Sequence, residues 1–292
     1  MPSRISEESN ELTNELTNSV DIVSRFLALE QIYSASHLDT YLQSLQQTND
    51  DVSTDVIVLC ASAILAIPEA VFEWAVQQQT SPETRKGNTV LVLCGGIGPC
   101  TPFVYDAIKA SKKYSPIFEE INGEPEGQIL RAMAERYYRL NVKNEKTTRE
   151  GFNIIVSDRS TDCGADARET RKVLDGHGIS FPRSITVVQD PAMSSRTVSS
   201  FEGIYNDQDV RVSSWPQTRP DLMSNQGGTQ AGKENKMREL WSMDRFLDRI
   251  MGDTAYTQSE LGEGRKKNVD IPNEVEDAWS TIMEKNSLKV SC

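Results

Sequence analysis

The strongest constraint on the fold is an alternation, between residues 55 and 216, of short apolar runs with longer segments of helical character. The runs are DVIVLCA (55–61), NTVLVLC (88–94), FNIIVSD (152–158), SITVVQD (184–190) and DVRVSSW (209–215). Most of them are rich in Val and Ile without polar alternation, which is typical of strands buried on both faces. Repetition of strand and helix predicts an α/β fold with a mostly parallel sheet and right-handed crossovers.

The segments on either side of this alternation read as helical, so three parts are expected. Residues 1–50 form a helical N-terminal lead-in, residues 51–216 the α/β domain, and residues 217–292 a helical C-terminal region that packs on it. The lead-in carries apolar side chains at helical spacing, at Val20, Val23, Phe26, Leu27 and Ile32. The C-terminal region opens with a polar, glycine-containing loop and continues with predicted helices that begin near residues 233 and 269.

The charge of the chain narrows the class of partner. The net charge is −12, whereas nucleic acids and anionic membranes require a basic surface, so neither is expected as a partner. No stretch has the roughly 18 apolar residues of a membrane span, and the polar N-terminal segment does not resemble a signal peptide. A small molecule is the expected partner and the cytoplasm the expected location; the sequence leaves the oligomeric state open.

The counts of cysteine and histidine restrict the chemistry further. Five cysteines, none of them in C-x-x-C spacing, predict neither a disulfide framework nor a metal site. Cys60 and Cys94 lie within apolar runs and are interpreted as small core residues. The two histidines, His37 and His177, both fall in polar surroundings and are interpreted as surface residues rather than catalytic bases.

Chemistry is expected where the strands end, because ligands of open parallel sheets bind outside the carboxyl ends of the strands. Four such ends carry small, hydroxylated or glycine-rich residues: LCASAI, CGGIGPCT, SDRSTDCGAD and QDPAMSSRT. In the second loop, Gly96 and Gly98 would let the backbone approach a phosphate or carboxylate, and Thr101 would cap the next helix. The alternative interpretation is a tight turn followed by an ordinary helix cap.

The third and fourth ends add polar and charged side chains. Asp158, Ser160, Thr161 and Asp162 precede one helix, and Arg196 follows a turn at Asp190 early in the next. An arginine in the first turn of a helix opposes the helix dipole, which hints at an anionic partner. Cys100 and Cys163 lie at predicted helix N-termini, where the pKa of a thiol falls, and either is a candidate nucleophile.

Taken together, these loops resemble a known family. The segments that carry the resemblance are GGIGPCTPFVYDAI (95–108), EGQIL (126–130), DRSTDCGADAR (158–168), VVQDPAMSSRT (187–197) and VDIPNEVEDAW (269–279). They are similar to the YdcF-like proteins, a bacterial and fungal group related to the SanA and ElyC proteins. The resemblance implies a Rossmann-like fold with helices on both faces of the sheet and a smaller helical addition. It also implies binding of S-adenosylmethionine, but no established reaction.

The resemblance further implies a set of ligand-binding residues. These are Gly95, Gly96, Gly98, Thr101, Glu126, Ser160, Thr161, Gly164, Asp190 and Arg196. Two positions depart from the family pattern, because its usual Glu-Asn is replaced here by Ala165 and Asp166. Cys100 stands where the family has a hydroxyl or another small residue, which argues against a role as nucleophile.

Three functions are compatible with these features. The first is a small-molecule-binding protein for S-adenosylmethionine or a nucleotide-like ligand. The second is a hydrolase or transferase for a phosphorylated or glycosylated substrate, with Glu126, Asp158 or Asp190 as general acid or base, since histidine is scarce. The third is an interaction protein with a vestigial pocket.

Overall fold

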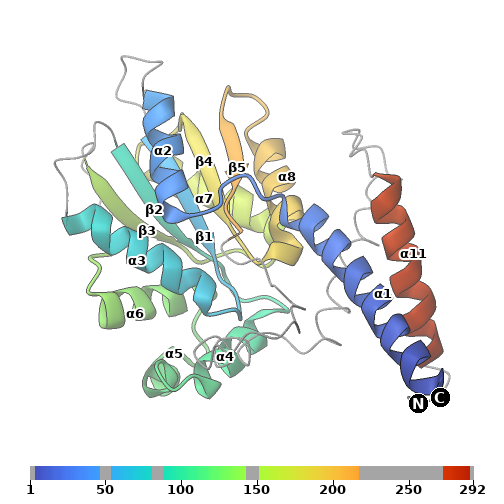
Figure 1. Cartoon of the computed structure of the whole chain (residues 1–292). Coiled ribbons are helices and arrows are strands. Elements are labelled where there is room, and N and C mark those ends of the chain that lie inside the picture. Colours follow the sequence, from blue (N-terminus) through green and yellow to red (C-terminus); the bar gives the residue numbers. More distant parts are fainter. Residues whose placement is uncertain (1–3, 47–53, 81–87, 143–150, 217–271, 290–292) are drawn as a thin grey trace.

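The central element of the fold is a five-stranded, all-parallel sheet (Figure 1). In this computed structural model, residues 4–46, 54–80, 88–142, 151–216 and 272–289 are described. The strands are β1 (Thr54–Cys60), β2 (Asn88–Cys94), β3 (Phe152–Ser157), β4 (Ser184–Val188) and β5 (Arg211–Ser214), in the order β3-β2-β1-β4-β5. The chain winds outward from β1 in both directions, which is a Rossmann-like arrangement and confirms the predicted α/β fold class.

Helices cover both faces of the sheet, and alternate strand residues face each layer. One layer contains α2 (Ala35–Gln46), α3 (Ala66–Thr80) and α6 (Glu126–Tyr138), which pack on Ile57, Leu59, Leu91 and Leu93. The other contains α7 (Cys163–Gly176) and α8 (Ser194–Ile204), which pack on Val56, Val58, Val90 and Val92. Because both faces are buried, the first two strands are continuous apolar runs, as the sequence predicted.

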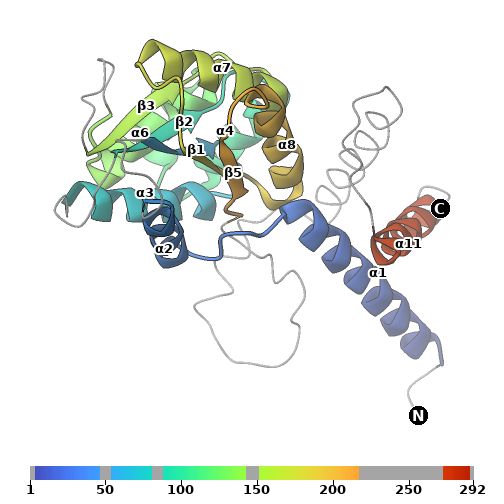
Figure 2. The ribbon, with the colours of Figure 1, turned by 90° about the horizontal axis from the view of Figure 1, so that it is seen from above.

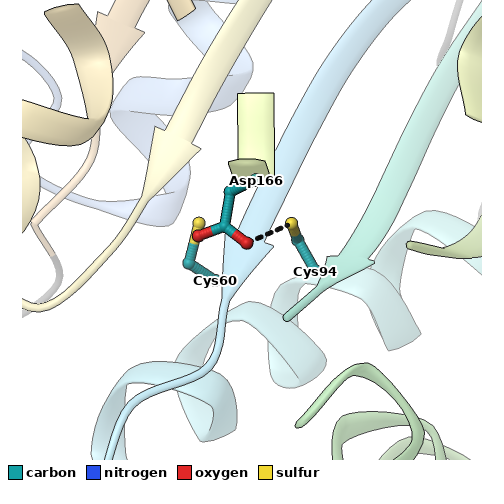
Figure 3. Close-up of side chains that lie close together, drawn as sticks. All are labelled: Cys60, Cys94 and Asp166. Carbon is teal, nitrogen blue, oxygen red and sulfur yellow. Dashed lines mark hydrogen bonds between the residues drawn. The ribbon is translucent and has the colours of Figure 1, made fainter. Parts of the chain in front are cut away.

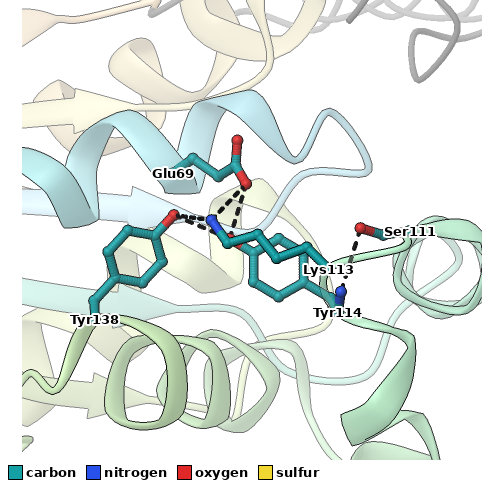
Figure 4. A network of polar contacts seen from close by, with 5 residues as sticks. All are labelled: Glu69, Ser111, Lys113, Tyr114 and Tyr138. Carbon is teal, nitrogen blue, oxygen red and sulfur yellow. Dashed lines mark hydrogen bonds and ion pairs between the residues drawn. The ribbon is translucent and has the colours of Figure 1, made fainter. Parts of the chain in front are cut away.

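The first helical layer is tied together by a polar network between α3, α6 and the segment after α4 (Thr101–Ala110) (Figure 4). Glu69 Oε1 accepts hydrogen bonds from Lys113 Nζ (3.0 Å) and from the Tyr114 hydroxyl (2.9 Å), and Lys113 also donates to the Tyr138 hydroxyl. Tyr114 is fully buried. α4 ends at Ala110, where Ser111 is extended, and Tyr114 turns into the core.

The connection between α4 and α6 contains two short helices, η2 (Ser115–Ile117) and α5 (Phe118–Ile121). Ile117 and Ile121 bury their side chains in the same core cluster as α3 and α6. α6 then begins directly after Pro125, which places Glu126 in its first turn. This connection therefore sets where the amino end of α6 meets the loop after β2.

The terminal helices lie side by side, at one edge of the α/β domain (Figures 1 and 2). α1 (Arg4–Ala28) contributes Val20, Val23 and Leu27 to a small apolar cluster, and α11 (Asn273–Lys289) contributes Val275, Ala278 and Ile282. The cluster also includes Ala192 of η3 (Pro191–Met193), the short helix between β4 and α8. The α1–α11 pair therefore supports the loop that follows β4.

The predicted helix that begins near residue 233 lies outside the described residues. Within the described part of the C-terminal region, α11 is helical and contacts α1. The three-part division of the chain stays a prediction. None of the helices that the structure describes is long and apolar enough to cross a membrane.

Candidate functional site

A cavity of about 230 Å³ opens at the carboxyl ends of β1, β2, β3 and β4. It is lined by Ala61, Ser62, Ala63, Gly96, Gly98, Pro99, Cys100, Phe103, Val104, Glu126, Ser160, Thr161, Asp162, Cys163, Asp166, Gln189, Asp190, Met193 and Arg196. All four loops that the sequence singled out contribute to its wall, together with the first residue of α6. The structure thus brings together segments that lie far apart in the chain.

Most of the predicted ligand-binding residues line this cavity. Those that do so are Gly96, Gly98, Glu126, Ser160, Thr161, Asp190 and Arg196. Gly95, Thr101 and Gly164 lie beside the lining but not in it. Of the three candidate general acids or bases, Glu126 and Asp190 line the cavity, whereas the Asp158 carboxylate accepts a hydrogen bond from Gln128 Nε2 at 2.7 Å.

The glycine loop is packed against the loop after β3. A Cβ atom on Gly96 would lie 1.8 Å from the carbonyl oxygen of Ser160, and one on Gly98 would lie 2.6 Å from that of Thr161. The Gly96 N–H donates to Ser160 Oγ (2.9 Å), and the Gly98 N–H donates to Thr101 Oγ1 (2.8 Å). These two N–H groups therefore already have partners in the chain, and an anion would have to be held by other groups.

The same loop positions the amino end of α6. The carbonyl oxygens of Gly95 and Gly96 accept hydrogen bonds from the N–H groups of Gly127 (2.6 Å) and Glu126 (3.1 Å), groups that a helix start leaves unpaired. Gly95 has φ +143°, and a Cβ atom there would meet the Glu126 side chain at 2.7 Å. Thr101, which is buried, donates from Oγ1 to Glu126 Oε1 at 2.9 Å. Thr101 thus orients Glu126 from behind the cavity wall.

Two carboxyl groups of α7 face the cavity, and their environments differ. Asp162 caps the helix by accepting from the Ala165 N–H (2.9 Å), and this hydrogen bond lowers the pKa of its carboxyl. Asp166, one turn further on, is only 8% exposed, and burial raises the pKa of its carboxyl. Asp162 is therefore a fixed negative charge, while Asp166 is the buried acid at the same wall.

The loop after β4 and the start of α8 also contribute to the cavity wall. Asp190 is 4% exposed, and its Oδ1 accepts from the Ala192 N–H at 3.1 Å in an N-cap of η3. The Gln189 side chain accepts from the Asp190 N–H at 2.7 Å. Within the part of the chain that the structure describes, Arg196 is the one cationic side chain of the lining.

The cavity therefore combines several acidic side chains with one basic side chain. Among the described residues, four carboxyl groups line it, those of Glu126, Asp162, Asp166 and Asp190, against one guanidinium, that of Arg196. Phe103, which is 40% exposed, adds an aromatic surface to the wall. Such a site favours a ligand that carries positive charge, hydroxyl groups and one anionic group.

The histidines do not contribute to this site. His37 Nδ1 accepts from the Tyr33 N–H at 3.2 Å, and the His37 ring stacks on the Tyr33 ring. His177 follows the last residue of α7, and burial lowers the pKa of its imidazole. Neither lines the cavity, so a proton transfer there would not use a histidine, and the carboxyl groups of the lining are the candidate acids and bases.

The candidate nucleophiles, by contrast, both lie at the cavity. Cys100 is the N-cap residue of α4 and Cys163 is the first residue of α7, and both line the wall. Cys163 is only 7% exposed. Neither thiol has a histidine in the lining to act as its base.

Several lining residues were not predicted. Asp166 follows Asp162 by four residues on α7, a spacing that places both on one helix face and was the available signal. Ser62 belongs to the loop after β1, which the sequence marked only as a strand end. Phe103 and Met193 also line the cavity, and no local pattern in the sequence marks either as a site residue.

Comparison with known proteins adds no identification. No family model matches the chain, and no solved structure matches it significantly. The resemblance to the YdcF-like proteins therefore stays a prediction that depends on the quoted motifs.

Proposed function

We propose that this protein is a small-molecule-binding member of the YdcF-like family and that its ligand is S-adenosylmethionine or a related nucleotide-like compound. The observation that carries the proposal is the composition of the cavity wall, where four carboxyl groups and one guanidinium meet at the carboxyl ends of the strands. That edge is where open parallel sheets of this topology bind their ligands.

The chemistry of S-adenosylmethionine matches this wall. The molecule carries a sulfonium cation, an α-amino group, one carboxylate and two ribose hydroxyls. Arg196 suits the carboxylate, since a guanidinium binds carboxylates through two parallel hydrogen bonds. The carboxyl groups of Asp190 and Glu126 suit the amino group and the hydroxyls, and the Phe103 ring suits a cation or an adenine base.

The size of the cavity refines the binding mode. Its volume of about 230 Å³ lies below the ~300–1,000 Å³ of common ligand pockets. We expect the charged methionine end of the ligand to enter the cavity and the adenosine end to lie at the mouth, near Phe103. A nucleoside triphosphate is disfavoured, because its phosphates would face four carboxyl groups.

Calorimetric titration of the full-length protein tests the proposal. The protein is titrated in parallel with S-adenosylmethionine, adenosine and ATP, after native mass spectrometry of a sample purified without added ligand. We expect one S-adenosylmethionine per chain, weaker adenosine and no ATP, and any retained molecule should have the mass of a nucleoside derivative. No heat with any of the three compounds, and no retained mass, would reject the binding function in this form.

The second candidate is an enzyme with carboxyl general acid–base chemistry, favoured by the presence of both Glu126 and Asp190 in the lining. Glu126→Gln and Asp190→Asn separate the two candidates. For a binding protein, both variants change affinity and no turnover of the bound ligand is detected. For a hydrolase or transferase, the wild type slowly converts the ligand on incubation, and one of the two variants binds it without conversion.

A further inference from the structure

Next to the cavity, two thiols and one carboxyl group converge from three elements of the fold (Figure 3). Cys60 is the last residue of β1, Cys94 the last residue of β2, and Asp166 lies in the first turn of α7. Their Sγ atoms and a carboxylate oxygen all lie within 4.8 Å of one another, and Cys94 Sγ lies 3.4 Å from Asp166 Oδ1. All three residues are buried.

The sheet fixes this arrangement. Cys60 and Cys94 are register partners in the parallel pair β1–β2, so their side chains point to the same face of the sheet. That face is covered by α7, whose start after the Asp162 cap places Asp166 above the two thiols. Thr170, one turn beyond Asp166, brings its hydroxyl to 3.5 Å from Cys94 Sγ. The trio is therefore held by secondary structure and not by a loop.

We infer that Cys60, Cys94 and Asp166 form a binding site for a thiophilic divalent cation, with Zn²⁺ as the best match. Thiolate and carboxylate oxygen are ligands that Zn²⁺ accepts, at about 2.3 Å and about 2.0–2.2 Å respectively. In a tetrahedral site these lengths place a sulfur and an oxygen ligand about 3.5 Å apart, close to the 3.4 Å between Cys94 Sγ and Asp166 Oδ1. Two sulfur ligands would lie about 3.8 Å apart, within the observed limit of 4.8 Å.

Because the trio adjoins the cavity, a cation bound by it would be accessible from the cavity. Asp166 belongs both to the trio and to the lining of the cavity, so a cation held by its carboxylate would lie at the cavity wall. Three protein ligands leave a fourth position for water or a ligand group, which is the arrangement of catalytic rather than structural zinc sites. The spacing of cysteines in the sequence did not reveal this site, because its ligands come from residues 60, 94 and 166.

Cobalt titration of the full-length protein tests this inference. The protein is reduced, freed of metals with a chelator, and titrated with Co²⁺ while the absorption spectrum is recorded. We expect one equivalent of Co²⁺ to produce the near-ultraviolet sulfur-to-cobalt charge-transfer band and the intense visible bands of tetrahedral cobalt. Zn²⁺ should then remove these bands, since sites of this kind bind Zn²⁺ more tightly than Co²⁺.

Variants locate the bound metal. Cys60→Ser and Cys94→Ser should each lose most of the charge-transfer band, and Asp166→Asn should weaken Co²⁺ binding by at least roughly tenfold. Cys100→Ser is the matched control, because Cys100 lines the cavity but is not part of the trio, and it should keep the wild-type spectrum. Far-ultraviolet circular dichroism checks that each variant is folded.

Two outcomes would overturn the inference. The first is wild-type protein that shows no charge-transfer band, since Co²⁺ held only by surface carboxylates has no sulfur ligand. The second is a band that survives in folded Cys60→Ser and Cys94→Ser but disappears in Cys100→Ser. The titration uses no organic ligand, so its failure would leave the proposed binding of S-adenosylmethionine untouched.

Discussion

At the amino ends of the strands, the carboxylate of Asp55 is fully buried and is enclosed by Arg183, which donates to both of its oxygens, and by the Ser184 hydroxyl at 2.6 Å. At the carboxyl ends, four carboxyl groups and Arg196 line a cavity of about 230 Å³. At the amino ends of the strands (the amino edge), a buried charge is thus neutralised by the charge beside it. At the carboxyl ends (the carboxyl edge), several charged groups surround a cavity. Enclosed pairs of this kind stabilise or specify a fold, whereas convergent polar groups at a cavity are what a ligand site requires.

The largest change in stability is expected from a substitution at the amino edge. Asp55→Ala leaves the Arg183 guanidinium, only 10% exposed, without its carboxylate, and should lower the free energy of unfolding by about 3–5 kcal/mol. Urea unfolding followed by circular dichroism measures the change. Ligand affinity of the folded fraction should not change, since Asp55 lies at the far edge of the sheet. A loss below about 1 kcal/mol would show that the pair is energetically unimportant.

The next largest change is expected from a substitution at the carboxyl edge, and it concerns both stability and ligand binding. Gly96→Ala places a Cβ atom 1.8 Å from the Ser160 carbonyl oxygen, which forces the loops after β2 and β3 apart. We expect a loss of about 1–3 kcal/mol in stability together with loss of ligand binding. Calorimetric titration and urea unfolding of the same sample measure both quantities.

Gly203→Ala is the matched control for that variant. Gly203 lies in α8, and a Cβ atom there meets nothing within 4 Å. The substitution should stabilise the protein by about 0.5–1 kcal/mol and leave ligand binding unchanged. Equal effects of the two glycine variants would contradict the claim that close packing of the two loops builds the cavity.

A smaller effect concerns pH. His177 follows the last residue of α7, on the side of the amino ends of the strands, because this crossover helix runs back along the sheet. Burial lowers the pKa of its imidazole below the ordinary value of about 6.5. The unfolded chain therefore binds this proton more readily, so stability should fall as the pH drops below about 6.5. In His177→Gln this part of the decline should disappear, as urea unfolding over a pH series would show. An unchanged dependence of stability on pH in this variant would contradict the role given to His177.

The fold class and the position of the cavity could be predicted from the sequence, because the strands are continuous Val- and Ile-rich runs and the loops after them are polar. The start of α7 at Cys163 was predicted, since Asp162 is a residue type that caps helices and its side chain does so here. The hydrogen bond that occupies the Gly96 N–H was not predictable, because its acceptor is the side chain of Ser160, 64 residues away. The trio of Cys60, Cys94 and Asp166 was missed for the same reason, since it depends on strand register and on the cap of α7.

The central claim is that the carboxyl edge holds the ligand through Arg196 and the facing carboxyl groups. Its most direct test is calorimetric titration of S-adenosylmethionine into wild type, Arg196→Ala and Arg171→Ala. Arg171 is a matched arginine of α7 that is paired with Asp207 and does not line the cavity. We predict that Arg196→Ala weakens binding by roughly 10–100-fold and that Arg171→Ala binds like wild type. Equal affinities for all three proteins, or an equal loss in both variants, would contradict the account.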